Sequence, residues 1–97
     1  MSREYILDCE NMTDRDKAHE YIAEVLEFPD YYGKNLDALF DCLTEMGECS
    51  ILFINLEALD MLGEYSGAML AVFEEAEAIN DDLTLVYDST EDTEFYD

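Results

Sequence analysis

Positive charge is scarce in this sequence. Four Lys and Arg residues stand against 26 Asp and Glu residues, the formal net charge at pH 7 is −22, and no Lys or Arg follows Lys34. Clustered Lys and Arg side chains bind phosphates, so the composition argues against direct nucleic acid binding and against binding to an anionic membrane surface. The partner that such a surface attracts is a basic protein. Adaptation to a salty cytoplasm would give the same composition and stays open as a second explanation.

Long apolar runs and paired cysteines are also missing. No stretch approaches the roughly 18–20 apolar residues that span a membrane, and the first residues lack the apolar segment of a signal peptide. The three cysteines, Cys9, Cys42 and Cys49, form an odd number without a C-x-x-C spacing. This pattern disfavours a disulfide framework or a zinc finger and favours a reducing compartment. We therefore expect a cytoplasmic protein.

Catalytic and cofactor-binding motifs are lacking as well. The chain has only four glycines, with no glycine-rich phosphate loop, no EF-hand loop and no His-Glu-x-x-His motif. The one histidine, His19, lies among Asp16, Glu20 and Glu24 on the polar side of a predicted helix, so we expect it to face solvent. No serine or cysteine nucleophile is placed beside it, and Cys42 is expected to be a structural thiol. The sequence thus predicts no catalytic residue, no cofactor and no metal site.

Three short apolar runs are predicted to be strands, at residues 5–7, 51–54 and 83–87. The middle run is continuous, as in a parallel strand buried on both faces. Helical patterns separate the runs in the order β, α, α, β, α, α, β, which favours right-handed parallel crossovers. The predicted fold class is α/β, a three-stranded parallel sheet with helices packed around it. We expect a single domain over residues 1–88 and a poorly ordered acidic tail over residues 89–97.

Capping residues bound the predicted helices. Thr13, with Asp16 three residues later, is expected to cap the first helix. Asn35 is expected to cap the second helix and Ser66 the last one, with a short helical segment over residues 56–62 before it. The apolar positions at helical spacing, which should face the core, are Ala18, Tyr21, Ile22, Val25, Leu26, Leu36, Leu39, Phe40, Leu43, Met69, Leu70, Val72, Phe73 and Ala76.

The second predicted helix carries two negative charges on one face. Asp37 and Asp41 are four residues apart and share a helical face, where their repulsion amounts to about 0.2–0.5 kcal/mol. The helix dipole favours Asp37 near the N-terminus but gives Asp41 no such support. Residues 31–33, Tyr-Tyr-Gly, lead into this helix, and tyrosines beside carboxylates are typical of surfaces that bind Arg or Lys. One tyrosine should pack onto the core. The pattern predicts a protein-binding face centred on Asp41, and an enzyme using the two aspartates as acid and base is the least favoured alternative.

A resemblance to the barstar family, the intracellular inhibitors of barnase-type ribonucleases, is carried by residues 28–43, which read FPDYYGKNLDALFDCL. The similarity continues more loosely through residues 72–78 and the last predicted strand, and covers most of residues 4–88. The resemblance implies the same three-stranded parallel sheet with helices. It also implies a monomeric, stoichiometric inhibitor without enzymatic activity, which plugs the basic active site of a ribonuclease in a one-to-one complex.

The resemblance implies roles for individual residues. Asp41 would take the place of an RNA phosphate and pair with the catalytic Arg and His groups of the enzyme. Asp37 would bond a neighbouring basic region, and Tyr31 would pack against the catalytic His. Glu75, from the last predicted helix, would form an ion pair at the rim. The residues that would shape the same surface are Gly33, Asn35 and Phe40.

Two positions depart from barstar itself. Lys34 stands where barstar has an acid and places a positive charge at the edge of the proposed site. Phe40 replaces a tryptophan and removes its indole N–H. Together with the more negative net charge, these differences point to a partner whose contacts differ from those of barnase. A cognate toxin nuclease, with this chain as its antitoxin, is one such partner. A barstar-like module that sequesters a different basic protein is the main alternative.

Overall fold

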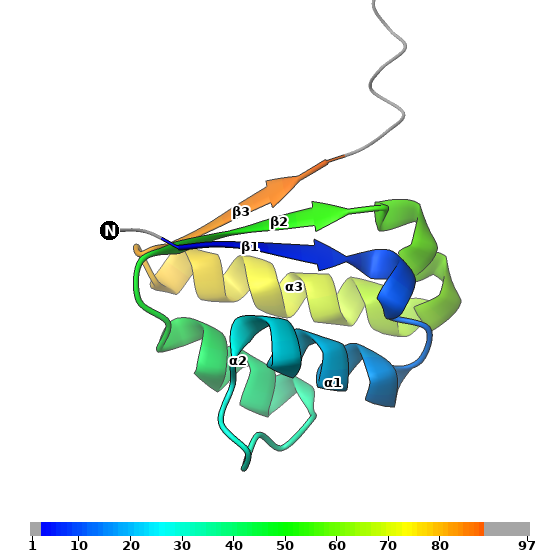
Figure 1. Cartoon of the computed structure of the whole chain (residues 1–97), viewed down its shortest axis with the longest axis horizontal. Coiled ribbons are helices and arrows are strands. Elements are labelled where there is room, and N and C mark those ends of the chain that lie inside the picture. Colours follow the sequence, from blue (N-terminus) through cyan, green and yellow to red (C-terminus); the bar gives the residue numbers. More distant parts are fainter. Residues whose placement is uncertain (1–2, 89–97) are drawn as a thin grey trace, which may run out of the picture.

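The computed structural model describes residues 3–88. It contains a three-stranded parallel sheet in the order β1-β2-β3, with three α-helices below the sheet in Figure 1. The elements are the strands β1 (Arg3–Asp8), β2 (Cys49–Ile54) and β3 (Leu83–Tyr87), the helices α1 (Arg15–Leu26), α2 (Leu36–Thr44) and α3 (Glu64–Ile79), and the 3₁₀ helices η1 (Cys9–Asn11) and η2 (Leu56–Leu62). The predicted fold class and the parallel sheet are confirmed. The predicted tail, residues 89–97, lies outside the described residues.

Within residues 3–88, the helices cover one face of the sheet and leave the other face open. Side chains alternate between the two faces of a strand, and Leu7 and Phe53 are fully buried on the helix side. The register places Ile6 opposite Leu52, and Leu52 opposite Val86, in one row on the other face. Ile6 and Val86 are exposed there, and Leu52 is half-buried. The prediction that the middle strand is buried on both faces is therefore wrong for the outer face, because all three α-helices pack on one side.

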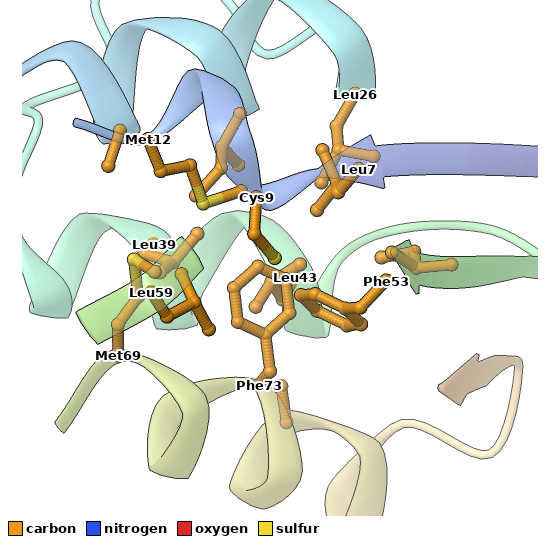
Figure 2. Close-up of a cluster of buried hydrophobic side chains, with 14 of the residues drawn as sticks. Leu7, Cys9, Met12, Leu26, Leu39, Leu43, Phe53, Leu59, Met69 and Phe73 are labelled. Atoms are coloured by element: carbon orange, nitrogen blue, oxygen red, sulfur yellow. The ribbon is translucent and has the colours of Figure 1, made fainter. Parts of the chain in front are cut away.

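The core lies between the sheet and the helices, where the rings of Phe53 and Phe73 meet edge to face with centroids 5.0 Å apart (Figure 2). Burying a side chain of this size stabilises the fold by about 1.5–3 kcal/mol. Of the helix positions predicted to face the core, Ala18, Ile22, Leu26, Leu39, Leu43, Met69, Phe73 and Ala76 are buried. The remaining predicted positions, Tyr21, Val25, Leu36, Phe40, Leu70 and Val72, are partly buried against the same cluster.

Two helix starts differ from the prediction. Asp14, rather than Thr13, caps α1, because its carboxylate accepts the backbone N–H of Lys17 at 2.8 Å. The last helix begins one turn earlier than Ser66 would allow, directly after Gly63, whose φ of 60° favours glycine. The Ser66 hydroxyl instead donates to the carbonyl of Gly63 at 2.8 Å, inside the first turn of α3. The short helical segment η2 matches the predicted residues.

The second helix and the loop before it lie far from the sheet. Figure 1 shows α2 and this loop at the bottom of the molecule, with the strands at the top. Helix α2 packs against α3, which in turn packs against β3. Within residues 3–88, none of the helices has the length and apolar character needed to cross a membrane. The fold thus presents α2 and its loop at the end of the molecule opposite the sheet.

Candidate partner-binding face

Helix α2 starts at a cap that also holds the preceding loop. The side-chain oxygen of Asn35 accepts the backbone N–H of Ala38 at 2.8 Å, which confirms the predicted N-cap. The amide nitrogen of Asn35 donates to the carbonyl of Gly33 at 3.3 Å. A Cβ atom at Gly33 would lie only 3.2 Å from that nitrogen, so a larger residue would disturb the cap. Asn35 therefore joins the loop to the first turn of α2.

The two tyrosines of the loop have opposite environments. Tyr31 is 87% exposed, whereas Tyr32 is 7% exposed and packs on Phe28 with ring centroids 5.0 Å apart. The backbone N–H of Tyr32 donates to the carbonyl of Pro29 at 3.0 Å and closes a turn. The prediction that one tyrosine packs onto the core is confirmed. Because Tyr32 anchors the loop, the ring of Tyr31 is held out in solvent.

His19 lies beneath the loop. The sequence pattern predicts that it faces solvent, and this prediction is wrong. His19 is 1% exposed, and its Nδ1 and Nε2 atoms lie 2.6 Å from the hydroxyl groups of Tyr32 and Tyr65. The loop and the first turn of α3 supply these two tyrosines, and together they cover a histidine that borders the polar side of α1. His19 thus links three segments that are distant in the sequence.

The charge state of this cluster follows from its burial. Desolvation lowers the pKa of His19, Arg15 lowers it further, and Asp16 raises it. Desolvation also raises the pKa of Tyr32. In neutral His19 one ring nitrogen donates to a tyrosine hydroxyl and the other accepts from the second hydroxyl, so both nitrogens are satisfied. The cluster is therefore an uncharged support for the loop.

Asp41 opens onto a hollow of about 460 Å³ between α2, the loop and the end of α1. We call it the Asp41 hollow. Tyr31, Gly33 and Cys42 line it, and so do two further carboxylates, Glu27 and Glu45. No Lys or Arg of the described residues lines it, although Arg3, outside the hollow, forms an exposed ion pair with Glu27 at 3.5 Å. An Arg or Lys side chain of a partner would meet three carboxylates here, and such charge-assisted hydrogen bonds are about twice as strong as neutral ones.

Cys42 has the properties of a structural thiol. Burial raises the pKa of its thiol, and the carboxylates of Glu45 and Asp41 raise it further. The thiolate, which is the nucleophilic form, is therefore disfavoured at neutral pH. Cys42 supplies packing in this hollow rather than reactivity.

Asp37 opens onto a different hollow, of about 540 Å³, which we call the Asp37 hollow. Asn35, Lys34, Arg15 and Tyr65 also line it. Two aspartates that face different hollows are poorly placed to act as acid and base on one bound substrate. Among residues 3–88, no group of three His, Cys, Asp or Glu side chains is placed to hold a metal ion.

The remaining predicted site residues lie outside both hollows. Phe40 is half-buried and packs against the core, and Glu75 is exposed on α3. The structure thus brings together Tyr31, Gly33 and Asp41 in one hollow, and Asn35 and Asp37 in the other.

Glu27 and Glu45 are the two site residues that the sequence reading misses. Glu45 lies four residues after Asp41 and continues the spacing that begins at Asp37, so the series itself could have indicated it. Glu27 follows the last residue of α1 in a left-handed conformation, with φ of 63°. Its place in the hollow depends on the path of the loop, which no local pattern in the sequence reveals.

Comparison with known proteins agrees with this architecture. Residues 3–88 match the model of the family described as "Barstar (barnase inhibitor)". The chain is also 35% identical over 88 residues, 87% of this chain and 97% of the relative, to a protein of Bacillus subtilis (strain 168) named "Putative ribonuclease inhibitor YrdF". The family match spans all three strands and all three α-helices of the fold. This chain belongs to the barstar family.

Proposed function

We propose that this protein is a stoichiometric inhibitor of a barnase-type ribonuclease and has no enzymatic activity of its own. Family membership supports the class of target. The observation that carries the proposal is the Asp41 hollow, in which three carboxylates and the exposed Tyr31 gather. Of these carboxylates, Glu27 has an exposed ion pair with Arg3 at 3.5 Å, whereas Asp41 and Glu45 form no ion pair with the described residues. A hollow of this kind is complementary to the cationic cleft with which a ribonuclease binds RNA.

The proposed mechanism is mimicry of an RNA phosphate. The carboxylate of Asp41 occupies the position of a phosphate and accepts hydrogen bonds from the Arg and His groups of the enzyme. Glu27 and Glu45 extend the negative charge around the entering cation. When this cation pairs with Asp41, the repulsion between Asp37 and Asp41 is relieved, and the helix no longer carries that cost of about 0.2–0.5 kcal/mol.

The surrounding residues give the face its shape. Tyr31 offers a rigid ring that packs on the catalytic His, and Asp37 bonds a second basic region at the edge of the cleft. Gly33 and Asn35 fix the loop against α2, as their contacts indicate. The residues that contribute from the margin are Phe40, half-buried on α2, and Glu75, exposed on α3.

The test is a titration of barnase with this protein while RNA cleavage is followed. We expect inhibition to be complete at one molecule of inhibitor per enzyme. Asp41→Ala leaves buried cations of the enzyme unpaired, a loss of about 2–5 kcal/mol. A loss of about 2 kcal/mol corresponds to about thirtyfold weaker binding, so we expect inhibition to weaken at least this much. Asp60→Ala is the matched control, since Asp60 is an exposed aspartate on η2 that lines neither hollow.

Equal inhibition by Asp41→Ala and Asp60→Ala would remove α2 from the mechanism. If barnase is not inhibited at any ratio, the partner is a different basic protein. The immobilised chain would then be used to capture basic proteins. Sedimentation of the complex decides its composition, for which we expect one copy of each chain.

A further inference from the structure

The Asp37 hollow has a charge pattern unlike the rest of the protein. Arg15 and Lys34, two of the only four cationic residues in the chain, line this one hollow. The carboxylates of Asp16 and Asp37 line it as well. Two cations at the edge of an acidic binding face weaken its attraction for a uniformly basic partner. Their position therefore favours a partner surface that is not uniformly basic.

Arg15 is held in place and has unused donors. Its guanidinium carbon lies 4.4 Å from the centroid of the Tyr65 ring, and the Tyr65 hydroxyl is 2.6 Å from Nε2 of His19. Stacking on an aromatic ring occupies the face of a guanidinium and leaves its N–H edge for a planar acceptor. Among residues 3–88, the Arg15 side chain makes no hydrogen bond and no ion pair.

The position of Arg15 in its helix is unfavourable for its charge, and among residues 3–88 the contact with the Tyr65 ring is the interaction that holds it there. It is the first residue of α1, where the helix dipole disfavours a positive charge. No carboxylate of the described residues offsets this by an ion pair with Arg15. A cation that is positioned by an aromatic ring but has no internal hydrogen-bond acceptor is suited to an acceptor that arrives from outside.

Lys34 can bind a carboxylate of a partner without losing a strong contact inside the protein. Its Nζ atom lies 3.3 Å from a carboxylate oxygen of Glu20, and both side chains are about half exposed. Exposed ion pairs of this kind contribute little to stability, so Lys34 can turn from Glu20 to a charge on a partner. The two cations then flank the hollow from α1 and from the loop.

We propose that the Asp37 hollow is a second recognition site of the inhibitory face, where Arg15 and Lys34 take an aspartate or glutamate side chain of the target ribonuclease while Asp37 pairs with a basic group of the same enzyme. This inference rests on the proposed function. The N–H edge of Arg15 binds the carboxylate with two hydrogen bonds, and Lys34 adds a point charge. The target enzyme would then carry an acid beside its cationic cleft, and ribonucleases without this acid would be bound less tightly.

The test uses a library of catalytically inactive barnase in which each exposed residue around the cleft is replaced singly by Asp, Glu, Asn or Gln. The affinity of each barnase variant is measured for three forms of this protein: the natural chain, Arg15→Gln and Lys17→Gln. Lys17 is an exposed cation on the same helix that lines neither hollow, so it is the matched control. Thermal unfolding of both variants checks that they are folded.

We expect at least one position where Asp or Glu, but not Asn or Gln, tightens binding to the natural chain about tenfold, as one charge-assisted pair provides. Arg15→Gln should abolish this gain and Lys17→Gln should keep it. The inference is overturned if no acidic substitution tightens binding, or if the gain survives in Arg15→Gln. If no acidic substitution tightens binding but the natural chain still inhibits barnase, the inference fails and the proposed function stands. If no member of the library is bound, the proposed function fails together with it.

Discussion

His19 is the residue through which the exposed Tyr31 depends on the rest of the molecule. Tyr31 is held out by the loop, the loop is anchored by the buried Tyr32, and the hydroxyl of Tyr32 is satisfied by His19. A polar group that is buried without a partner costs about 1–3 kcal/mol. The orientation of a surface ring thus rests on a hydrogen bond inside the protein.

A double-mutant cycle tests this dependence. His19→Phe keeps an aromatic ring but leaves the Tyr32 hydroxyl buried without a partner, and we expect a loss of about 1–3 kcal/mol in the free energy of unfolding. Adding Tyr32→Phe removes the orphaned hydroxyl and should recover part of that loss. Urea unfolding of the four proteins measures the coupling. Losses that simply add would show that the two groups do not interact.

The lowered pKa of His19 makes stability depend on pH. The unfolded chain takes up a proton near the usual pKa of 6.5, while the folded chain does so only at lower pH, so the unfolded state binds more protons in between. The free energy of unfolding should therefore fall as pH drops below about 6.5, down to the folded pKa. The difference in unfolding free energy between the natural protein and His19→Phe isolates this contribution from the many carboxylates. A difference that is constant with pH would contradict the assignment.

At the level of secondary-structure elements, sequence patterns predict what depends on near neighbours. The spacing of Leu39 and Leu43 and the cap at Asn35 are local, and the structure confirms them. Thr13 and Asp14 are adjacent and both suit an N-cap, so the pattern could not choose between them. His19 is buried by residues 13 and 46 positions away, and no periodicity within α1 contains that information.

The two caps allow stability to be separated from binding. Asn35→Ala and Asp14→Ala each remove a side-chain acceptor from the start of a helix, and we expect each to lower the free energy of unfolding by about 0.5–2 kcal/mol. Only Asn35 lies on the proposed binding face, so only its loss should also weaken inhibition of barnase beyond the effect on stability. Unfolding in urea and the titration of RNA cleavage provide the two readouts. Equal weakening of inhibition by both variants would show that the Asn35 cap acts through stability alone.

At the scale of the whole molecule, the net charge of −22 acts in two opposite directions. Like charges repel one another within the folded chain, and the same charges attract a basic partner from a distance. Salt screens both effects, with a Debye length of about 10 Å at 0.1 M. The net charge is known from the composition alone. The grouping of Glu27, Asp41 and Glu45 in one hollow is known only from the three-dimensional structure.

Added salt should therefore stabilise the protein and slow its association. Between 0.05 and 0.5 M NaCl, on the order of a tenfold range, we expect the unfolding temperature to rise and the association rate with barnase to fall by at least tenfold. Thermal unfolding and stopped-flow association measure the two trends. KCl should give the same values as NaCl, since screening does not distinguish them. An association rate that does not change with salt concentration would argue against electrostatic steering.

The open face of the sheet offers a place to attach the protein without touching its binding face. Figure 1 places the strands and α2 at opposite ends, and Thr84 is exposed on the outer face of β3. Burial raises the pKa of all three natural thiols, that of Cys9 to about 11, so they react slowly with maleimides at neutral pH. A single cysteine introduced at Thr84 would then be labelled selectively. Immobilised through it, the chain would present α2 to the solution, as a capture reagent for ribonucleases requires.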